Sequence, residues 1–352
     1  MLDAATFRFL NVERTLQNGA DWNRADWPRL WLYNLHYFDD LVADNAIVRT
    51  AWHRDLIARW IAENPPARGA GWEPYPISLR IVNWIKWALA GNALGADALH
   101  SLAMQARWLR KRIEFHLLGN HLWANAKALV FAGTFFDGAE GARWRRRGMA
   151  LLRRELAEQI LSDGGHFERS PMYHAIVLED LLDLLQLASL FPDAFAAADV
   201  ECWKRIATRM LRWLRVMTHP DSEIALFNDA AFGIAPNLAA LSDYAARSDV
   251  GFDVAPLGAI EALPDSGYVR MQMGDAIVIA DVGAIGPDYL PGHAHADTLS
   301  FELSLAGTRV LVNGGTSTYE QDAERLRQRG TVAHNTVQVD GQDSSEVWAA
   351  FR

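Results

Sequence analysis

The sequence predicts an α-then-β protein, in which a long helical part precedes an antiparallel β part. Apolar residues recur every three to four positions up to about residue 250, which is the period of an amphipathic helix. After about residue 264 they alternate with polar residues at a period of two, which is typical of strands with one buried face. Short breaks separate the helical segments, so successive helices are expected to pack as antiparallel neighbours in a bundle or a toroid.

The helical period is clearest in six segments, at residues 53–64, 77–92, 98–118, 143–161, 174–191 and 202–218. A further helix is expected to begin near Asn120, whose side chain could cap first-turn amides. Cys202 is the only cysteine, so no intrachain disulfide can form, and it is expected to be a packing residue. This helical part is predicted to form a first domain over residues 1–255.

The β part is predicted to contain two hairpins and one further strand. The hairpins turn at Gly274-Asp275 and at Ala306-Gly307, and the further strand lies within residues 335–342. Residues 255–267 are expected to be a linker. The second domain, residues 265–352, is predicted to be the N-terminal part of a β-sandwich. It looks truncated at its C-terminus because a sandwich usually needs about seven strands.

Composition restricts the classes of function. The chain of 352 residues has a net charge of −9, which argues against a general nucleic-acid binder but allows a local basic cleft for an anionic ligand. No apolar run is long enough to span a membrane. The N-terminal residues lack the pattern of a signal peptide, so either the protein is cytoplasmic or this chain lacks its true start. The compartment and the oligomeric state stay open.

Polar side chains gather at two predicted helix starts. The stretch GNHLWANAK places Asn120, His121 and Asn125 at the first of them. The stretch SDGGHFERSPMYH leads into the second, where Pro171 suits the first helical turn. Its polar or ionisable residues are Asp163, His166, Glu168, Ser170, Tyr173 and His174. Because these are more than a cap requires, this loop is expected to carry function.

Two further clusters lie in the β part, and one arginine stands out in the helical part. In PGHAHADTLS, the residues His293, His295 and Asp297 could share one face of an extended segment. Two imidazoles on one face suit a divalent metal, or a base beside a ligand. His334 precedes the last predicted strand. Arg80 is expected either to make a surface ion pair or to bind a carboxylate or sulfate in a bidentate way.

Taken in order, these clusters resemble the heparinase II/III family of polysaccharide lyases. The resemblance covers nearly the whole chain, beginning with FRFLN and LWLYNLHYFDDL and continuing through GWEPYPISLRIVNW. It ends at LVNGGTSTYE and RGTVAHNTVQVDGQ. It implies an incomplete (α/α) toroid followed by an antiparallel β-sandwich. It also implies that the partner is an anionic polysaccharide containing uronic acid, cleaved by β-elimination. Many family members are exported.

The resemblance implies four catalytic residues. Asn120, aided by His121, would neutralise the uronate carboxylate so that an enolate-like state can form. Tyr173 would give a proton to the leaving oxygen and, with some substrates, also take the C5 proton. His121 or His293 would be the base when the proton lies on the other side. On this hypothesis Asn120, Tyr173 and His293 converge on one cleft.

Five further residues are expected to contact the glycan, namely Arg80, Trp72, Trp123, Glu168 and His174. The two tryptophans sit beside polar loop residues, and an aromatic face suits the C–H face of a sugar. The alternative for each tryptophan is core packing, which is its commoner environment.

The resemblance also implies a structural zinc in the β part, at the positions of His295, Asn313 and His334. Metal-binding members carry an aspartate where this chain has Asn313, and a neutral amide is the poorer zinc ligand. Two imidazoles with water or a shifted Asp297 would then have to suffice. His293 and His295 would point to different groups, which requires an irregular segment. A second departure is Ala124, where some members carry a glutamate.

Two alternatives stay open. A glycoside hydrolase needs two carboxylates that flank the bond, and Asp163 and Glu168 are the candidates, with Glu73 as a third. A non-catalytic glycan-binding or assembly protein would bind without cutting. The sequence identifies neither the glycan nor endo or exo action.

Overall fold

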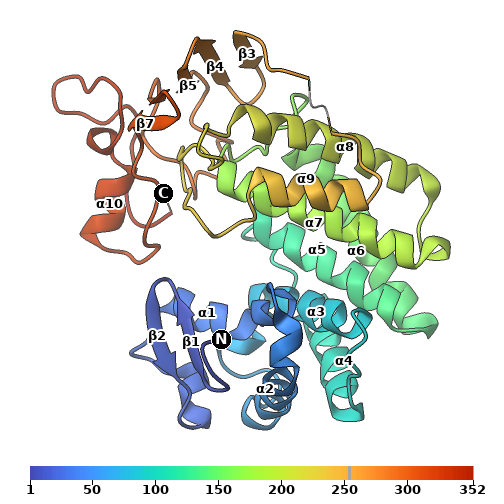
Figure 1. Ribbon diagram of the computed structural model, residues 1–352. Helices are drawn as coiled ribbons and strands as arrows, with labels where there is room; N and C mark the ends of the chain where they lie inside the picture. Colours follow the sequence, from blue (N-terminus) through green and yellow to red (C-terminus); the bar gives the residue numbers. More distant parts are fainter. Residues whose placement is uncertain (253–254, 352) are drawn as a thin grey trace. The chain divides into compact units, whose positions relative to one another are not determined.

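The computed structural model describes residues 1–252 and 255–351, so Arg352 lies outside the described residues. The chain divides into two compact units, Met1–Arg154 and Glu155–Arg352. This division falls inside the helical part, whereas the domains predicted from the sequence separate at residues 255–265. The change from helices to strands does occur in that predicted region, because the sheet begins at Ile260 (Figure 1).

The first unit opens with a two-stranded antiparallel hairpin that the sequence analysis did not predict. Its strands are β1 (Thr6–Phe9) and β2 (Val12–Thr15). The turn residues Leu10 and Asn11 both have positive φ angles, of 52° and 59°. Two such residues make a turn whose twist matches that of the paired strands. This turn was missed because leucine is a poor signal for positive φ.

Five helices follow the hairpin in the first unit. They are α1 (Arg29–Tyr37), α2 (Thr50–Glu63), α3 (Pro74–Leu89), α4 (Ala96–Lys111) and α5 (Gly119–Phe135). The helix α6 (Gly138–Gln159) begins in the first unit and ends in the second. Short 3-10 turns occupy Gly19–Asn23, Asp39–Val42, Ala46–Arg49, Ala70–Trp72, Pro192–Ala194 and Thr331–Ala333. The four helices predicted over residues 53–161 are therefore confirmed, with boundaries shifted by a few residues.

The core of the first unit is built from tryptophans and from a close helix pair. Trp60 and Trp84 are fully buried and meet edge to face, with ring centroids 5.8 Å apart. The helices α5 and α6 approach at Gly133, where an added Cβ would lie 2.2 Å from the backbone nitrogen of Arg145. Any other residue at this position would force the two helices apart.

The second unit contains three long helices and a sheet. The helices are α7 (Pro171–Leu190), α8 (Ala197–Val216) and α9 (Leu238–Arg247), and α7 and α8 confirm the segments predicted at residues 174–218. A short helix, α10 (Ala323–Arg329), follows the sheet and was not predicted. Among the described residues, no helix is long and apolar enough to cross a membrane.

The sheet has five antiparallel strands in sequence order, β3 (Ile260–Leu263), β4 (Tyr268–Met273), β5 (Ala276–Asp281), β6 (Phe301–Leu305) and β7 (Thr308–Leu311). Both predicted hairpins are confirmed, as β4–β5 and β6–β7. Two predictions are wrong. The expected linker contains β3, and residues 335–342 form only an isolated bridge between Val339 and Gln342. The segment 335–342 alternates like a strand, but within the described part of the chain its only strand pairing is this bridge.

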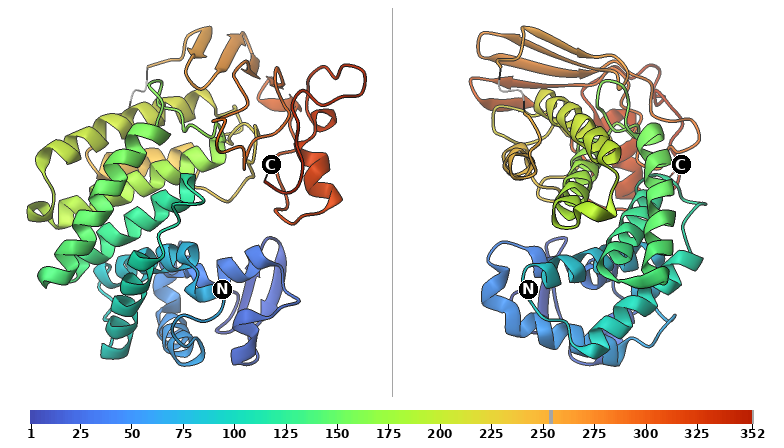
Figure 2. Two further views of the ribbon diagram at one scale, coloured as in Figure 1. Left: turned by 180° about the vertical axis from the view of Figure 1, so that it is seen from behind. Right: turned by 90° about the vertical axis from the view of Figure 1, so that its right-hand side faces the viewer.

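One face of the sheet packs on the C-terminal end of α8 (Figure 2). Trp213 and Met217 of this helical segment are fully buried against Leu263, Tyr268 and Ile279 of the strands. Burying an aliphatic or aromatic side chain of this size contributes about 1.5–3 kcal/mol each. This contact fixes the sheet against the helices of its own unit, and the loop between β5 and β6 carries His293 and His295.

Candidate active-site residues in the two units

In the first unit, the N-terminus of α5 carries Asn120 and His121 in its first turn. The residue before the helix, Leu118, has φ 58° and ψ −154° and makes no side-chain cap hydrogen bond, and Asn120 lies inside the first turn instead of at the cap position. Asn120 therefore does not cap this helix, although the sequence favoured that role. A non-glycine residue in this backbone region is strained, and such strain is concentrated at functional sites.

Tyr75 contacts both of these residues. Its ring lies 4.4 Å from the ring of His121, measured between centroids, and the planes are tilted by 34°. The side-chain amide of Asn120 donates to the Tyr75 hydroxyl at 3.5 Å. The side chain of His121 is 29% exposed, so it remains open to a ligand. The third residue of this predicted cluster, Asn125, is fully buried and bonds to Glu114 and Ser78.

In the second unit, the N-terminus of α7 positions Tyr173. Ser170 caps the helix by accepting a hydrogen bond from the Tyr173 backbone nitrogen at 3.2 Å. The same hydroxyl donates to the backbone carbonyl of Asp229 at 2.5 Å. Pro171 occupies the first turn, as expected. The phenol side chain is thus held at a rigid helix start rather than on a free loop.

His293 lies directly against Tyr173. The two rings are stacked with centroids 3.9 Å apart and an interplanar angle of 16°. His293 Nδ1 contacts the buried carboxylate of Glu168 at 2.5 Å. Burial alone would lower the pKa of His293, but the Glu168 carboxylate outweighs it and the pKa is raised. Glu168 was expected to contact substrate, but it is 3% exposed and its carboxylate contacts His293.

Tyr319 completes this group and was missed in the sequence. Its hydroxyl lies 3.0 Å from that of Tyr173, across 146 residues of sequence. Burial raises the pKa of Tyr319 well above its ordinary value, so its hydroxyl stays protonated. Phe351 stacks on the Tyr319 ring with centroids 5.7 Å apart. A lone tyrosine in the polar stretch STYE gives no periodic or spacing signal that could have revealed it.

His295 points away from Tyr173, toward a buried ionic cluster. His295 Nε2 lies 2.8 Å from Asp229 Oδ1, and both side chains are fully buried. Arg325 binds the same carboxylate through both terminal nitrogens, with Nη2 2.7 Å from Oδ2. Burial alone would raise the pKa of Asp229, but His295 and Arg325 hold it at about 2. Sequence reasoning missed both Asp229 and Arg325.

The residues predicted to bind zinc do lie together in part. The rings of His295 and His334 have centroids 5.3 Å apart, and His334 Nδ1 lies 3.2 Å from the side-chain oxygen of Asn313. His295 Nδ1 and His334 Nε2 are both buried and make no hydrogen bond within the described part of the chain. Burial lowers the pKa of both histidines, to about 3 for His334, so both are neutral as zinc requires.

The donor set nevertheless stops at these two imidazoles and one amide. Over residues 1–252 and 255–351, no group of three or more His, Cys, Asp or Glu side chains is arranged to hold a metal ion. Asp297 does not join them, because it is buried and accepts a hydrogen bond from the backbone nitrogen of Asn228 at 3.4 Å. A metal at this place would have two imidazole nitrogens, and water would have to complete its coordination, because the Asn313 oxygen bonds to His334 Nδ1.

Four of the residues predicted to contact the glycan have buried side chains. Arg80 is fully buried, and its guanidinium donates to the Gln105 side chain and to the backbone carbonyls of His36 and Gly71. Trp72 and Trp123 are 4% and 1% exposed, so core packing is their role. His174 is fully buried against Trp213, with ring centroids 4.2 Å apart.

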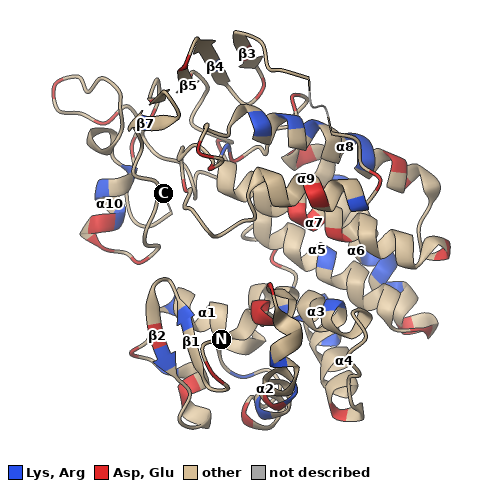
Figure 3. Ribbon diagram, in the orientation of Figure 1, with Lys and Arg blue, Asp and Glu red and all other residues tan. Residues whose placement is uncertain are grey.

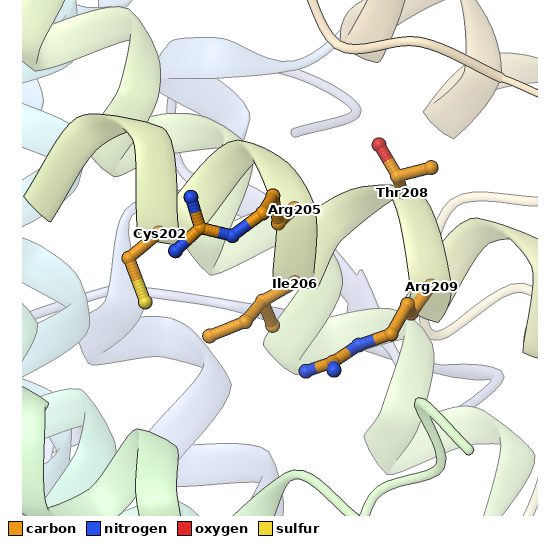
Figure 4. Close-up of a pocket in the computed structure, with 5 residues that line it drawn as sticks. All are labelled: Cys202, Arg205, Ile206, Thr208 and Arg209. Atoms are coloured by element: carbon orange, nitrogen blue, oxygen red, sulfur yellow. The ribbon is translucent and has the colours of Figure 1, made fainter. Parts of the chain in front are cut away.

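A hollow of about 480 Å³ lies elsewhere in the second unit, along α8 (Figure 4). It is lined by Cys202, Arg205, Ile206, Thr208 and Arg209. Several Lys and Arg positions mark this helix (Figure 3). None of the predicted site residues lines this hollow, and Cys202 is only partly buried there rather than a core residue.

A helical part precedes an antiparallel sheet, with Asn120, His121 and Tyr173 in the first turns of α5 and α7. The sequence profile of the heparinase II/III N-terminus matches residues 44–245, and that of the heparinase II/III-like C-terminal region matches residues 255–352. The chain therefore belongs to the heparinase II/III family, which confirms the resemblance seen in the sequence.

Several characterised relatives are similar to this chain. A heparin-sulfate lyase of Bacteroides stercoris is 27% identical over 244 residues, which cover 64% of this chain and 36% of that protein. A heparin-sulfate lyase of Pedobacter heparinus is 26% identical, over 70% of this chain and 40% of that protein. The FtsZ-localized protein C of Caulobacter vibrioides is 29% identical over 95% of this chain and 56% of that protein. The chain thus spans between 36% and 56% of the length of these relatives.

Solved structures share the fold at low sequence identity. A heparinase III structure superposes with a TM-score of 0.72 at 20% identity, covering 90% of this chain and 56% of that one. The heparan sulfate lyase HepC of Pedobacter heparinus gives a TM-score of 0.62 at 20% identity, covering 97% of this chain and 59% of that one. The prediction of a helix-rich part followed by an antiparallel sheet is therefore confirmed.

Proposed function

We propose that this protein is a polysaccharide lyase that cleaves an anionic, uronic-acid-containing glycan by β-elimination. The observation that carries the proposal is the group formed by Tyr173, His293 and Glu168, with Tyr319 at hydrogen-bonding distance from Tyr173. These groups can give and take protons, which is what elimination requires. The names of the similar heparin-sulfate lyases support the same class of substrate.

The reaction needs three functions from the chain. The uronate carboxylate must be neutralised while the C5 proton leaves, and we assign this to the Asn120 amide and His121. The O4 leaving group must receive a proton, and we assign this to the Tyr173 hydroxyl, which Tyr319 can resupply. As the C5 proton is taken and the C4–O4 bond breaks, a C4=C5 double bond forms. His121 or His293 takes the proton where the sugar presents it on the face away from Tyr173.

The same family resemblance leads us to propose that the helices form an incomplete (α/α) toroid and that the sheet belongs to a β-sandwich. Asn120, His121 and Tyr173 are held at helix starts, and rigid supports of this kind keep donors and acceptors within reach of reacting atoms. Figure 1 shows the helices and strands from which the proposal is made.

A glycoside hydrolase is less well supported by the carboxylates. Asp163 is engaged by the backbone nitrogen and the hydroxyl of Ser266, at 2.7 and 2.9 Å. Glu73 bonds to Arg29 and Tyr33. Glu168 bonds to His293. None of these groups is left as the free acid and base pair that hydrolysis needs.

We also propose that His295 and His334 hold one structural zinc ion, with Asn313 orienting His334. A zinc ion there would crosslink two loops of the second unit, since neutral imidazoles are suitable ligands. Elemental analysis of the purified protein tests this, together with the change in melting temperature on chelation. One zinc per chain that is lost in His334→Ala supports the site, and a metal-free protein of unchanged stability contradicts it.

A second candidate function is glycan binding without cleavage, as part of an assembly at a defined cellular place. The FtsZ-localized protein C, whose name states a cellular place and no reaction, matches a larger share of this chain than do the heparin-sulfate lyases of Bacteroides stercoris and Pedobacter heparinus, and this is the reason to consider the alternative. It predicts that a uronate glycan binds equally well to the protein and to Tyr173→Phe, without release of product. The lyase proposal predicts turnover that Tyr173→Phe lowers by on the order of 10²-fold or more.

A further inference from the structure

We propose that Glu114 is a positioning residue for His121. Its carboxylate holds Nδ1 of the imidazole, so that Nε2 is the nitrogen that acts on the glycan. The catalytic consequence rests on the function proposed above. The positioning of His121 by Glu114 can be measured without turnover, so this inference and the proposed lyase function can fail separately. Glu114 was not among the residues that the sequence singled out.

The contact is between a buried carboxylate and a buried nitrogen. Glu114 lies between α4 and α5 and is 6% exposed. Its Oε1 lies 3.3 Å from His121 Nδ1. That nitrogen is buried and has no hydrogen-bond partner within the described residues, so the Glu114 carboxylate faces it at ion-pair distance without completed hydrogen-bond geometry. A buried donor without an acceptor is costly, so the facing carboxylate is its natural partner. Contacts of this kind are often long before a ligand binds.

Asn125 fixes the orientation of the Glu114 carboxylate. The Asn125 amide nitrogen donates to Glu114 Oε2 at 3.0 Å and to the Ser78 hydroxyl at 3.0 Å. Its side-chain oxygen accepts from the Glu114 backbone nitrogen at 2.9 Å. An asparagine amide has two N–H donors, so both are spent. Oε2 is thereby committed to Asn125, and only Oε1 remains for His121.

The backbone of the connecting loop supports this arrangement. The backbone nitrogens of Leu117 and Leu118 both donate to the carbonyl of Glu114, at 3.1 and 3.2 Å. Leu118 then adopts its strained φ of 58°, from which the chain enters α5 and places His121 in the first turn. The strain at Leu118 is thus tied to the placement of a carboxylate beside the imidazole.

The chemistry that follows is a choice of tautomer. A carboxylate accepts only, so it selects the imidazole with hydrogen on Nδ1. Nε2 then carries a lone pair and can take a proton from C5 or accept a hydrogen bond from the glycan. Tyr75, whose ring lies 4.4 Å from that of His121, limits rotation of the imidazole. His293 shows the same arrangement in the second unit, with Nδ1 on Glu168.

Glu114→Gln gives the sharpest test. Because Asn125 must still donate to the position of Oε2, the glutamine oxygen belongs there and its NH₂ group faces His121. His121 Nδ1 would then accept, and the hydrogen would move to Nε2. We expect ¹⁵N NMR of histidine-labelled protein to show that His121 is the Nδ1–H tautomer. The His121 signal is assigned by its loss in His121→Ala. In Glu114→Gln it should show the Nε2–H tautomer.

Kinetics give a second readout on a uronate glycan. A wrong tautomer should lower kcat on the order of 100-fold or more, with little change in KM. Glu140→Gln is the matched control, since Glu140 is exposed and pairs with Arg107. An unchanged His121 tautomer in Glu114→Gln overturns the positioning role. If the tautomer switches but kcat does not change, the positioning by Glu114 has no effect on catalysis. If the tautomer switches but the wild-type protein cleaves no glycan, only the proposed lyase function is contradicted.

Discussion

The imidazole of His293 lies flat on the phenol of Tyr173, with ring centroids 3.9 Å apart. The two residues are far apart in sequence, and both are tied to the backbone of Asp229, Tyr173 through the cap residue Ser170 and His293 directly. Tyr173 is held by the capped start of α7, and His293 by Glu168 and by its backbone carbonyl, which accepts from the Asp229 nitrogen at 3.0 Å. This relationship gives the proposed lyase its proton-transfer groups.

Tyr173→Phe should lower kcat by on the order of 10²–10⁴-fold, because a positioned general acid contributes about that much. The phenyl ring keeps the stacking on His293, so the melting temperature should change little. Tyr289→Phe is the matched control, since Tyr289 is 55% exposed and bonds only to Glu158 within the described residues. Steady-state kinetics of both variants check this, and equal activity of Tyr173→Phe and the wild type would contradict it.

Tyr319→Phe should have a smaller effect than Tyr173→Phe. Its hydroxyl lies 3.0 Å from that of Tyr173, so it assists a neighbour instead of meeting the leaving oxygen. Loss of one hydrogen bond of about 1 kcal/mol corresponds to roughly a fivefold fall in kcat. A fall as large as that of Tyr173→Phe would show that Tyr319 itself transfers a proton in the rate-limiting step.

Arg80→Met should destabilise the protein without any selective effect on KM. The substitution leaves Gln105 and two backbone carbonyls without their buried donor, which costs about 3 kcal/mol or more. Urea unfolding measures this cost, and Arg110→Met on α4 is an exposed control expected to stay within about 0.5 kcal/mol of the wild type. A stable Arg80→Met variant with a raised KM would restore the substrate-binding role.

Asp281→Asn should stabilise the protein at alkaline pH. Burial raises the pKa of Asp281 to about 7, above its ordinary value in the unfolded chain, so the folded state favours the protonated form. Its contribution to stability is therefore complete below about pH 4 and is lost as the pH rises through 7. Asparagine keeps the acceptor for the Gly283 nitrogen without the charge.

Melting temperatures at several pH values check this prediction. The variant should melt above the wild type at pH 8 and equal it at pH 4. Asp275→Asn, in the exposed β4–β5 turn, should show no such dependence. A pH profile of Asp281→Asn that parallels the wild type would place the titrating group elsewhere.

The helices and strands whose apolar residues repeat regularly could be predicted from the sequence. Those that depend on a single turn or on pairing with another strand could not. The long helices and the hairpins β4–β5 and β6–β7 follow from their apolar patterns. The hairpin β1–β2 depends on two positive φ angles at Leu10 and Asn11, and β3 depends on pairing with β4. These strands have only four residues each, too few to show a clear hydrophobic period.

The site divides in the same way. Asn120, His121, Tyr173 and His293 stood out because polar residues crowd short stretches next to apolar patterns. Arg80 was misjudged because a buried arginine is rare and its partners, the Gln105 side chain and two backbone carbonyls, carry no sequence signal. Tyr319, Asp229 and Arg325 act through long-range contacts, which a single sequence does not reveal.

The most direct test of the central claim is a continuous ultraviolet assay of this chain with a panel of uronate polymers, namely heparan sulfate, hyaluronan, alginate and bacterial exopolysaccharides. β-Elimination conjugates a new C4=C5 double bond with the carboxylate, so the absorbance rises with turnover. We expect a rise with at least one polymer, reduced on the order of 10²-fold or more in Tyr173→Phe. No rise with any polymer, or release of reducing ends without absorbance, would contradict the proposal that this protein is a lyase.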